Sequence, residues 1–271
     1  MRKSILLFIP LSILAAAVLA ASSHDNEVLS RARAMQLEFR QGNPAVAGPL
    51  VKMLDEAVAK SPDNAALWEN LGHANMAKTA AMSEGPLNIP ALLAATKQAR
   101  EAYARSLALK PDNMLALSSH GMASLVVAQF EGDTAGMAKG VEEMNEAVRK
   151  SPKTASVRLT RAFTTINFPP AMRDNDAVID DLQFILDAST GGRPDDVLHV
   201  LLGDVYAETG KLEAARGEFA QVTGASAFAA EQVKLRVADL EKGAITPAYI
   251  LKVRESTGSH CATCHAAGTD N

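Results

Sequence analysis

The sequence predicts an all-α protein, an α-solenoid of about four helix pairs with a helical tail at its C-terminus. Two observations lead to this fold class. Alanine and leucine are abundant, and only 4% of the 271 residues are aromatic, which favours helices over strands. In addition, a short proline turn of similar sequence recurs along the chain and separates one apolar-periodic segment from the next. Repeated helix–turn units of this kind are typical of stacked arrays.

The recurring turns occupy residues 60–64, 110–113 and 150–153, and each has the form Lys-Pro or Lys-Ser-Pro followed by polar residues. Proline cannot continue the preceding helix, and Asp or Asn can cap the next one. Each turn therefore ends one helix and begins another. A non-repeating helical bundle is the alternative, which the in-phase recurrence of the turns disfavours.

Large and small residues follow a fixed order around these turns. They read Trp68-x-x-Leu71-Gly72, Ala99-x-x-x-Tyr103, Leu202-Gly203-x-x-Tyr206 and Ala215-x-x-x-Phe219. This pattern resembles the tetratricopeptide repeat (TPR), in which a small eighth residue lets two helices approach closely and large residues fill the space beside them. The resemblance implies a curved solenoid whose concave groove binds partners, a fold that by itself supplies no catalysis.

The resemblance covers residues 26–243, and its copies are unequal. An insertion around Met82–Pro90 splits the first clear copy, because Gly85-Pro86 and Pro90 forbid a continuous helix. The copy around Leu159–Ile185 is the weakest, since Arg161 stands where an apolar residue is usual. A degenerate leading pair and a capping helix complete the array, at Glu27–Arg40, Leu50–Ala59 and Val233–Leu240.

Residues 1–21 have the pattern of an export signal. Arg2 and Lys3 precede an apolar run from Ile5 to Leu19, and small residues at the end of the run predict cleavage after Ala20 or Ala21. An uncleaved anchor is the alternative, which the short run and its proline disfavour. We therefore expect an exported protein with no stable membrane span after cleavage. Together with the tail motif described next, the alanine-rich signal indicates the periplasm.

The tail, residues 244–271, contains both cysteines of the chain in the sequence Cys261-x-x-Cys264-His265. This spacing is the attachment signature of a c-type haem. Two thiols three residues apart can form thioethers with the two vinyl groups on one porphyrin edge, and the following histidine can ligate the iron. A helix expected between Thr246 and Gly258 would deliver the motif. We expect one covalent haem c.

Three other interpretations of the motif remain open. A redox disulfide would normally begin a helix in a βαβ unit, and no strand pattern occurs here. A zinc site could use His260 with the three motif residues, but each histidine is adjacent to a cysteine and no second half-site exists. The third interpretation is chance. Common small cytochromes c have a distal methionine and a helical domain of their own after the motif. The tail has neither, which distinguishes it from them.

The first helix of each repeat should line the concave groove. With this assignment, the residues in the middle of the groove are mostly apolar. By register, the groove residues are Ala66, Glu69, His73, Met76, Leu115, Ser118, Met122, Leu125, Val126, Ser156, Leu159, Phe163, Ile166, Val197, Val200, Asp204 and Glu208. An exposed apolar surface of this size indicates binding or intramolecular cover. A register error of one would make some of these residues ordinary core. His120 and His199 fall at core-facing positions, where packed histidines are expected.

The second axial site of the iron has two interpretations. The haem can hang at the end of the array, open on one side or ligated by a partner. Alternatively, the tail can fold back over the concave face, where Met122, Met76 and His73 are the nearest plausible ligands by register. From Gly243 to Cys261 the chain could reach about 35–40 Å. The first interpretation leaves the groove free for peptides, which TPR grooves usually bind.

The net charge and the motifs of the chain exclude some classes of function. The formal net charge of −4 becomes about −6 without Arg2 and Lys3, and no basic run suggests nucleic acid as a partner. No nucleophile motif or phosphate loop indicates an enzyme. We expect a periplasmic TPR scaffold with one haem that acts in electron transfer or docks a redox protein or peptide. The alternative is an assembly factor for cytochrome c maturation or another periplasmic complex, with no redox role of its own.

Overall fold

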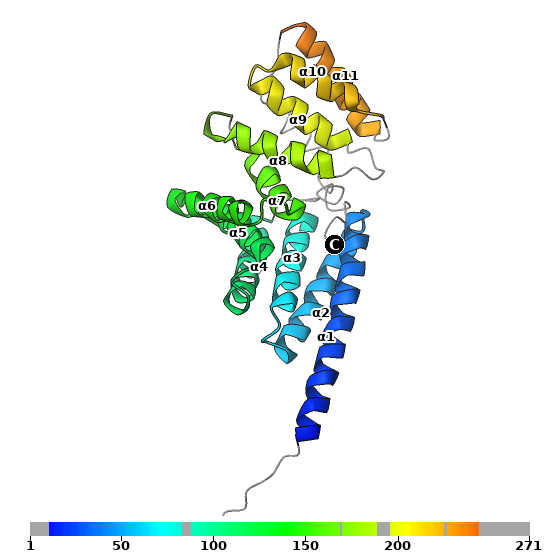
Figure 1. Ribbon diagram of the computed structural model, residues 1–271, viewed down its shortest axis with the longest axis vertical. Coiled ribbons are helices and arrows are strands. Elements are labelled where there is room, and N and C mark those ends of the chain that lie inside the picture. Colours follow the sequence, from blue (N-terminus) through cyan, green and yellow to red (C-terminus); the bar gives the residue numbers. More distant parts are fainter. Residues whose placement is uncertain (1–10, 83–87, 169, 189–195, 225–226, 244–271) are drawn as a thin grey trace, which may run out of the picture.

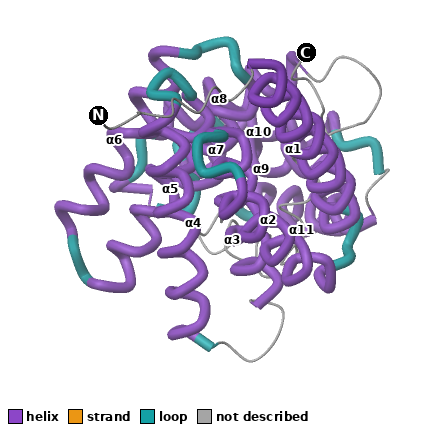
Figure 2. Tube along the Cα trace, turned by 90° about the horizontal axis from the view of Figure 1, so that it is seen from below, coloured by secondary structure: helices purple, strands orange, loops and turns teal. Residues whose placement is uncertain are grey.

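The computed structural model describes residues 11–82, 88–168, 170–188, 196–224 and 227–243. These ranges contain eleven α-helices and two short 3₁₀ helices, and no strand (Figures 1 and 2). The helices are α1 (Leu11–Arg40), η1 (Pro44–Val46), α2 (Ala47–Lys60), α3 (Ala65–Met82), α4 (Ile89–Leu109), α5 (Met114–Glu131), α6 (Thr134–Lys150), α7 (Ala155–Thr165), η2 (Pro170–Met172), α8 (Asn175–Ala188), α9 (Asp196–Glu208), α10 (Leu212–Gln221) and α11 (Ala227–Glu241). The predicted all-α class is confirmed.

The helices stack in chain order as a TPR-like α-solenoid. Figure 1 shows the array running from α1 and α2 at one end to α10 and α11 at the other. Four helix pairs form its body: α3 with α4, α5 with α6, α7 with α8, and α9 with α10. The predicted leading pair lies within α1 and α2, and the predicted capping helix lies within α11. The expected break around Met82–Pro90 is confirmed, since α3 ends at Met82 and α4 begins at Ile89.

The first helix continues through the predicted cleavage site. It begins at Leu11 and runs without interruption to Arg40. None of the helices in the described ranges combines the length and the apolar character that crossing a membrane requires. Removal of residues 1–21 stays a prediction.

Two of the recurrent turns place an asparagine as the cap of the next helix. The Asn64 side-chain oxygen accepts a hydrogen bond from Ala66 N at 3.0 Å, and that of Asn113 accepts one from Ala116 N at 3.1 Å. These bonds satisfy backbone donors that a helix start leaves unpaired. The third turn lacks this device, because Thr154 precedes α7 without a side-chain cap. The first two turns thus fix where α3 and α5 begin.

The glycines of the predicted repeat motif mark close helix approaches. A methyl group added at Gly72 would lie 2.4 Å from the ring of Tyr103, and one added at Gly203 would lie 2.4 Å from the ring of Phe219. Both rings are buried. Any side chain larger than hydrogen would push the aromatic ring out of its position, so the small and large positions of the repeat contact each other as the resemblance implies.

A third close approach joins α5 to α6 and involves backbone on both sides. A methyl group at Gly121 would lie 2.6 Å from the carbonyl oxygen of Gly140, and one at Gly140 would lie 2.5 Å from the carbonyl oxygen of Gly121. Backbone cannot rotate out of the way as a side chain can. The repeat pattern did not predict this contact. That pattern pairs a small residue with a large aromatic one, whereas here two glycines face each other.

The apolar core is divided along the array. One large cluster is formed by α1 to α4 and includes Leu50, Leu54 and Leu67. A second large cluster extends from α7 to α11 and includes Leu182 and Leu202. Between them lie two small clusters, one around Tyr103 and Ala123 and one around Met114, Ala147, Val148 and Val157. The α5–α6 pair therefore lies between the two large clusters, and it buries apolar side chains of its own, among them Leu125, Val127 and Met144.

Candidate functional site

The residues expected to attach haem lie outside the described part of the chain. Cys261, Cys264 and His265, together with the helix expected between Thr246 and Gly258, fall in residues 244–271. Among the described residues, no group of three or more His, Cys, Asp or Glu side chains could hold a metal ion. The haem site stays a prediction. The structure does describe the three residues that were suggested as the second ligand of the iron, together with their surroundings.

His73, one of the three suggested iron ligands, already has a partner at each ring nitrogen. Its Nδ1 is 2.8 Å from the Tyr103 hydroxyl oxygen, and its Nε2 is 3.6 Å from Glu69 Oε1. The His73 and Tyr103 rings meet edge to face, with centroids 5.2 Å apart. Binding of iron to this imidazole would break one of these contacts. His73 therefore serves the packing of α3 against α4.

Glu69 connects the same network to the next repeat. Asn113 Nδ2 donates a hydrogen bond to Glu69 Oε2 at 2.6 Å, while its oxygen caps α5. Burial acts to raise the pKa of the Glu69 carboxyl, but the hydrogen bonds and charge of His73, the Asn113 hydrogen bond and the Lys110 charge hold it below its ordinary value. Burial also raises the pKa of the Tyr103 hydroxyl, which keeps that group neutral. The network thus presents one stable negative charge.

The same kind of link occurs one repeat earlier. Asn64 Nδ2 donates to Asp25 Oδ2 at 3.0 Å, and Ser61 Oγ donates to Asp25 Oδ1 at 2.9 Å. Asp25 belongs to α1 and is 8% exposed. An acidic residue on the first helix of one repeat thus accepts a hydrogen bond from the asparagine that caps the first helix of the next repeat.

Replacing Asn113 with alanine should lower the free energy of unfolding by about 2 kcal/mol, because it removes a helix cap and a hydrogen bond to a charged carboxylate. The matched control is Asn88→Ala. Asn88 caps α4 through Ala91 N at 3.1 Å, so its loss should cost only about 1 kcal/mol. Urea unfolding of both variants measures the difference. Equal costs would show that the Asn113–Glu69 hydrogen bond contributes nothing to stability.

Met76 and Met122, the other suggested ligands, are half-buried on α3 and α5. The Met76 side chain packs against the small cluster of Ala99, Tyr103 and Ala123. A thioether in such a position contributes to packing and would have to leave it to reach a metal. The structure therefore places Met76 among contacts between helices, and Met122 is half-buried on α5.

The prediction of an apolar concave surface is wrong at six positions. The side chains of Ser118, Leu125, Leu159, Ile166, Val200 and Asp204 are buried. Four of them are apolar residues of the core. The register assumed from the sequence had therefore placed core residues on the surface. The rest of the set is half-buried: Ala66, Glu69, His73, Met76, Leu115, Met122, Val126, Ser156, Phe163, Val197 and Glu208.

His120 and His199 were expected to be packed histidines at core-facing positions, and they pack at the edge of the core and not within it. Their side chains are 20% and 22% exposed, and each faces a glutamate on the second helix of its own pair. His120 Nδ1 is 2.6 Å from Glu143 Oε2, and His199 Nδ1 is 2.8 Å from Glu218 Oε2. Both histidines thus join the two helices of a pair by polar contacts at the edge of the core.

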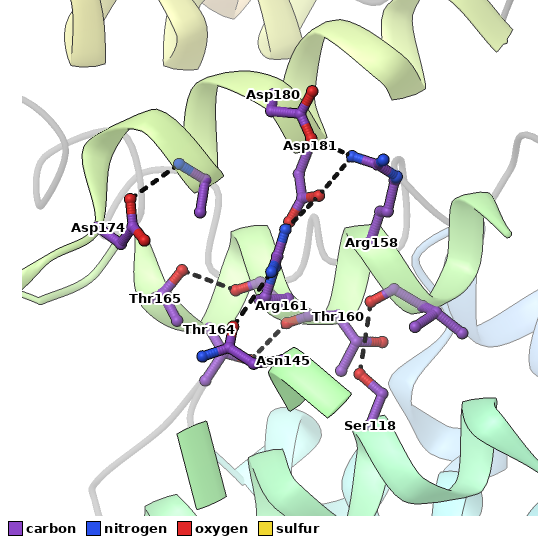
Figure 3. Close-up of polar contacts among 12 residues, drawn as sticks. Ser118, Asn145, Arg158, Thr160, Arg161, Thr164, Thr165, Asp174, Asp180 and Asp181 are labelled. Atoms are coloured by element: carbon purple, nitrogen blue, oxygen red, sulfur yellow. Dashed lines mark hydrogen bonds and ion pairs between the residues drawn. The ribbon is translucent and has the colours of Figure 1, made fainter. Parts of the chain in front are cut away.

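Arg161, the apparent departure from the repeat pattern, has a buried acidic partner. Its Nε and Nη2 donate to the two carboxylate oxygens of Asp181 at 2.7 and 2.8 Å, as Figure 3 shows. Arg158 donates to the same carboxylate at 2.9 Å. Burial raises the pKa of Asp181, and the hydrogen bonds and charges of Arg161 and Arg158 oppose that shift. At the position of Arg161, an ion-pair cluster between α7 and α8 takes the place of the apolar residue that the repeat pattern has there.

Two further buried ion pairs connect the last helices. Arg236 on α11 donates from Nε and Nη2 to the two carboxylate oxygens of Asp204 on α9, at 2.6 and 2.7 Å. Burial raises the pKa of Asp204 to about 6, against the opposing effect of Arg236. One turn along α9, Glu208 accepts a hydrogen bond from Arg173 Nη2 at 2.5 Å. Asp204 and Glu208, two of the three acidic residues that the sequence placed in the groove, are therefore neutralised within the protein.

No family model and no curated protein matches the chain. Several solved structures share its general form. The structure of MamA from AMB-1 has 17% sequence identity and a TM-score of 0.45, with 76% of this chain and 92% of that chain covered. For TTC0263, a thermophilic TPR protein in Thermus thermophilus, identity is 14%, TM-score 0.49 and coverage 71% and 91%.

A tetratricopeptide repeat protein from Parabacteroides merdae is 18% identical, with a TM-score of 0.37 and coverage of 89% and 97%. All three TM-scores are below 0.5. The assignment of a TPR-like solenoid therefore depends on the internal features described above: four helix pairs in chain order, and glycines at the closest approach of α3 to α4 and of α9 to α10.

Proposed function

We propose that the protein is an exported TPR-like scaffold that carries one covalent haem c on its C-terminal tail and docks a protein partner for electron transfer. One observation supports the haem above all others. The two cysteines of the chain are both in the sequence Cys261-x-x-Cys264-His265. The donor set fits the group, because two thiols and an adjacent imidazole are the residues that covalent haem attachment requires.

Attachment needs no group from the solenoid. Cys261 and Cys264 would each hold one vinyl group of the haem as a thioether, through an addition in which sulfur and hydrogen go to the two vinyl carbons and nothing leaves. His265 would supply one axial ligand. A bound haem c supplies one-electron transfer at the iron. The remaining residues would hold the tail, exclude water from part of the haem and present the scaffold surface to the partner.

The scaffold role is supported by the fold. A solenoid of helix pairs offers an extended surface and supplies no reaction chemistry of its own, so an enzymatic role is not proposed. Residues 1–21 support export to the periplasm. The partner would be a redox protein or a peptide that binds in or beside the concave surface.

The test is covalent haem content. The full chain, expressed with a periplasmic c-type maturation system, should give a haem-stained band after denaturing electrophoresis. Cys261→Ala combined with Cys264→Ala should abolish the band completely, while His260→Ala, adjacent to the motif, should retain it. Circular dichroism should stay unchanged in all variants, because the helices of residues 23–243 make the core described above.

An unstained wild-type band, with the tail shown intact by mass, would overturn the proposal. The assembly-factor alternative would then be favoured, since it needs the scaffold surface and no haem. Retention of stain in the double cysteine variant would show that haem is bound elsewhere and would equally contradict the assignment.

A further inference from the structure

A polar pocket lies where α4, α5 and α6 meet in the middle of the array (Figure 1). Its volume is about 260 Å³, which is below the range of roughly 300–1,000 Å³ that is usual for drug-sized ligands. Except for one alanine and one glycine, all of its lining residues have polar or charged side chains. The pocket therefore suits a small polar group, such as a single side chain of a partner, and we call it the α5 pocket.

The α5 pocket faces away from the surface that was expected to line the groove. His120 and Ser124, which line the pocket, are each two residues from Met122, a residue of the expected groove. Two residues correspond to a rotation of about 160° around a helix axis by the shorter way. A ligand in the α5 pocket would therefore leave the concave surface free.

Each acidic side chain of the α5 pocket has a partner within the protein. Glu143 Oε2 is 2.6 Å from His120 Nδ1, and Glu131 Oε1 is 2.6 Å from Lys97 Nζ. The third acidic residue, Asp133, caps α6 by accepting a hydrogen bond from a backbone N–H at 2.9 Å. The negative charges of the pocket are thus engaged.

The two cations that line the same pocket, Arg100 and Lys139, have no such partner. Neither side chain takes part in a hydrogen bond or an ion pair within the described ranges. Arg100 is half-buried on α4, and Lys139 is exposed on α6. A guanidinium that is partly withdrawn from water loses hydration, which a bound anion would replace. The unmatched charge of the pocket is therefore positive.

A carboxylate matches these groups better than a phosphate or a sulfate does. An arginine can donate to both oxygens of a carboxylate, and a lysine adds a second positive charge. The Ser124 hydroxyl is a third donor, and its side chain forms no hydrogen bond within the described residues. Because three carboxylates line the same pocket, a doubly charged anion would be repelled more strongly than a singly charged one.

We propose that the α5 pocket binds the carboxylate of an acidic side chain on a partner polypeptide. The size of the pocket fits one such side chain, its unmatched charge is complementary to a carboxylate, and a stacked helical array offers an extended surface to a polypeptide. This inference goes beyond the haem proposal and uses only residues between α4 and α6. It gives the scaffold a point of contact outside the concave surface.

The experiment titrates the full chain, labelled with ¹⁵N-histidine, with a capped tripeptide whose central residue is glutamate. The ring resonance of His120, assigned by its absence from His120→Gln, reports on the pocket. It should shift and saturate with this peptide and stay unchanged with the matched glutamine peptide, which has the same shape and no charge. Added sodium chloride should weaken the binding, because salt screens the attraction between charges. Acetate, the third probe, should bind more weakly than the glutamate peptide.

Arg100→Met should weaken binding of the glutamate peptide by about tenfold, and the exposed Lys139→Met by about threefold. The matched control is Arg105→Met, on the same helix but outside the pocket, where Arg105 pairs with the exposed Glu101. That variant should bind the peptide as the wild type does. Circular dichroism checks that each variant is folded, and Lys139→Met decides the test if Arg100→Met is not.

Equal binding of the glutamine peptide, or unchanged binding in both Arg100→Met and Lys139→Met, would overturn the assignment. Acetate that binds as tightly as the glutamate peptide would overturn the polypeptide as the source and indicate a free carboxylic acid. None of these outcomes depends on haem, since no residue of the pocket belongs to the tail. The two proposals can therefore fail separately.

Discussion

Replacing Arg236 with methionine should lower the free energy of unfolding by about 3–5 kcal/mol, the largest effect we expect from a single side chain. Arg236 and Asp204 are only 2% and 3% exposed, and two hydrogen bonds join them. Methionine fills the arginine stem's volume but leaves the Asp204 carboxylate buried without a counter-charge. The cost arises from that stranded charge, and urea unfolding followed by circular dichroism would measure it.

Two controls separate the buried pair from charge in general. Arg216→Met removes an exposed arginine whose partner, Glu213, is 88% exposed, so it should cost less than about 1 kcal/mol. Asp204→Leu combined with Arg236→Met should recover most of the stability, because an apolar pair needs no desolvation of charge. A double variant as unstable as Arg236→Met alone would mean that the stranded carboxylate does not determine the loss.

Replacing Gly121 with alanine should destabilise the protein by about 3 kcal/mol, although alanine normally favours a helix. The new methyl group would lie 2.6 Å from the carbonyl oxygen of Gly140, so α5 and α6 would have to separate. The matched control is Gly217→Ala in α10, where nothing lies within 4 Å of the added carbon. That variant should gain about 0.5–1 kcal/mol from helix propensity.

Thermal or urea unfolding of the two glycine variants gives the comparison directly. Stabilisation in both variants would contradict the close backbone approach between α5 and α6. A loss in both would mean that the flexibility of glycine, and not the helix–helix contact, is what the protein requires at these positions.

The sequence predicted the elements whose signals are local. Proline turns, the Asn64 and Asn113 caps and the break before α4 depend on residues close together in the chain, and the structure confirms them. The Gly203–Phe219 contact could also be predicted, because the repeat pattern fixes which two positions meet. Local propensity and pattern therefore account for most of the fold.

The contacts that could not be predicted join side chains of different helices. They depend on how each helix is rotated about its own axis, which the sequence does not determine. Arg161 seemed a defect because its partner, Asp181, comes from another helix. His120 and His199 were assigned to the core for the same reason, since Glu143 and Glu218 were not placed opposite them. A rotation of one residue moves a side chain about 100° around a helix, which is enough to exchange groove and core.

The division of the apolar core has a consequence for how the array opens. One cluster ends at α4 and the other begins at α7, and between them α5 and α6 form a closely packed pair that belongs to neither large cluster. In a one-dimensional array, stability is the sum of each unit and its nearest interfaces, so the weakest interface limits cooperativity. The two halves can thus behave as separate foldons, and opening on either side of the α5–α6 pair would change their relative orientation while each half stays folded. A partner that spans both halves would suppress this opening, and its binding would therefore couple the two ends of the array.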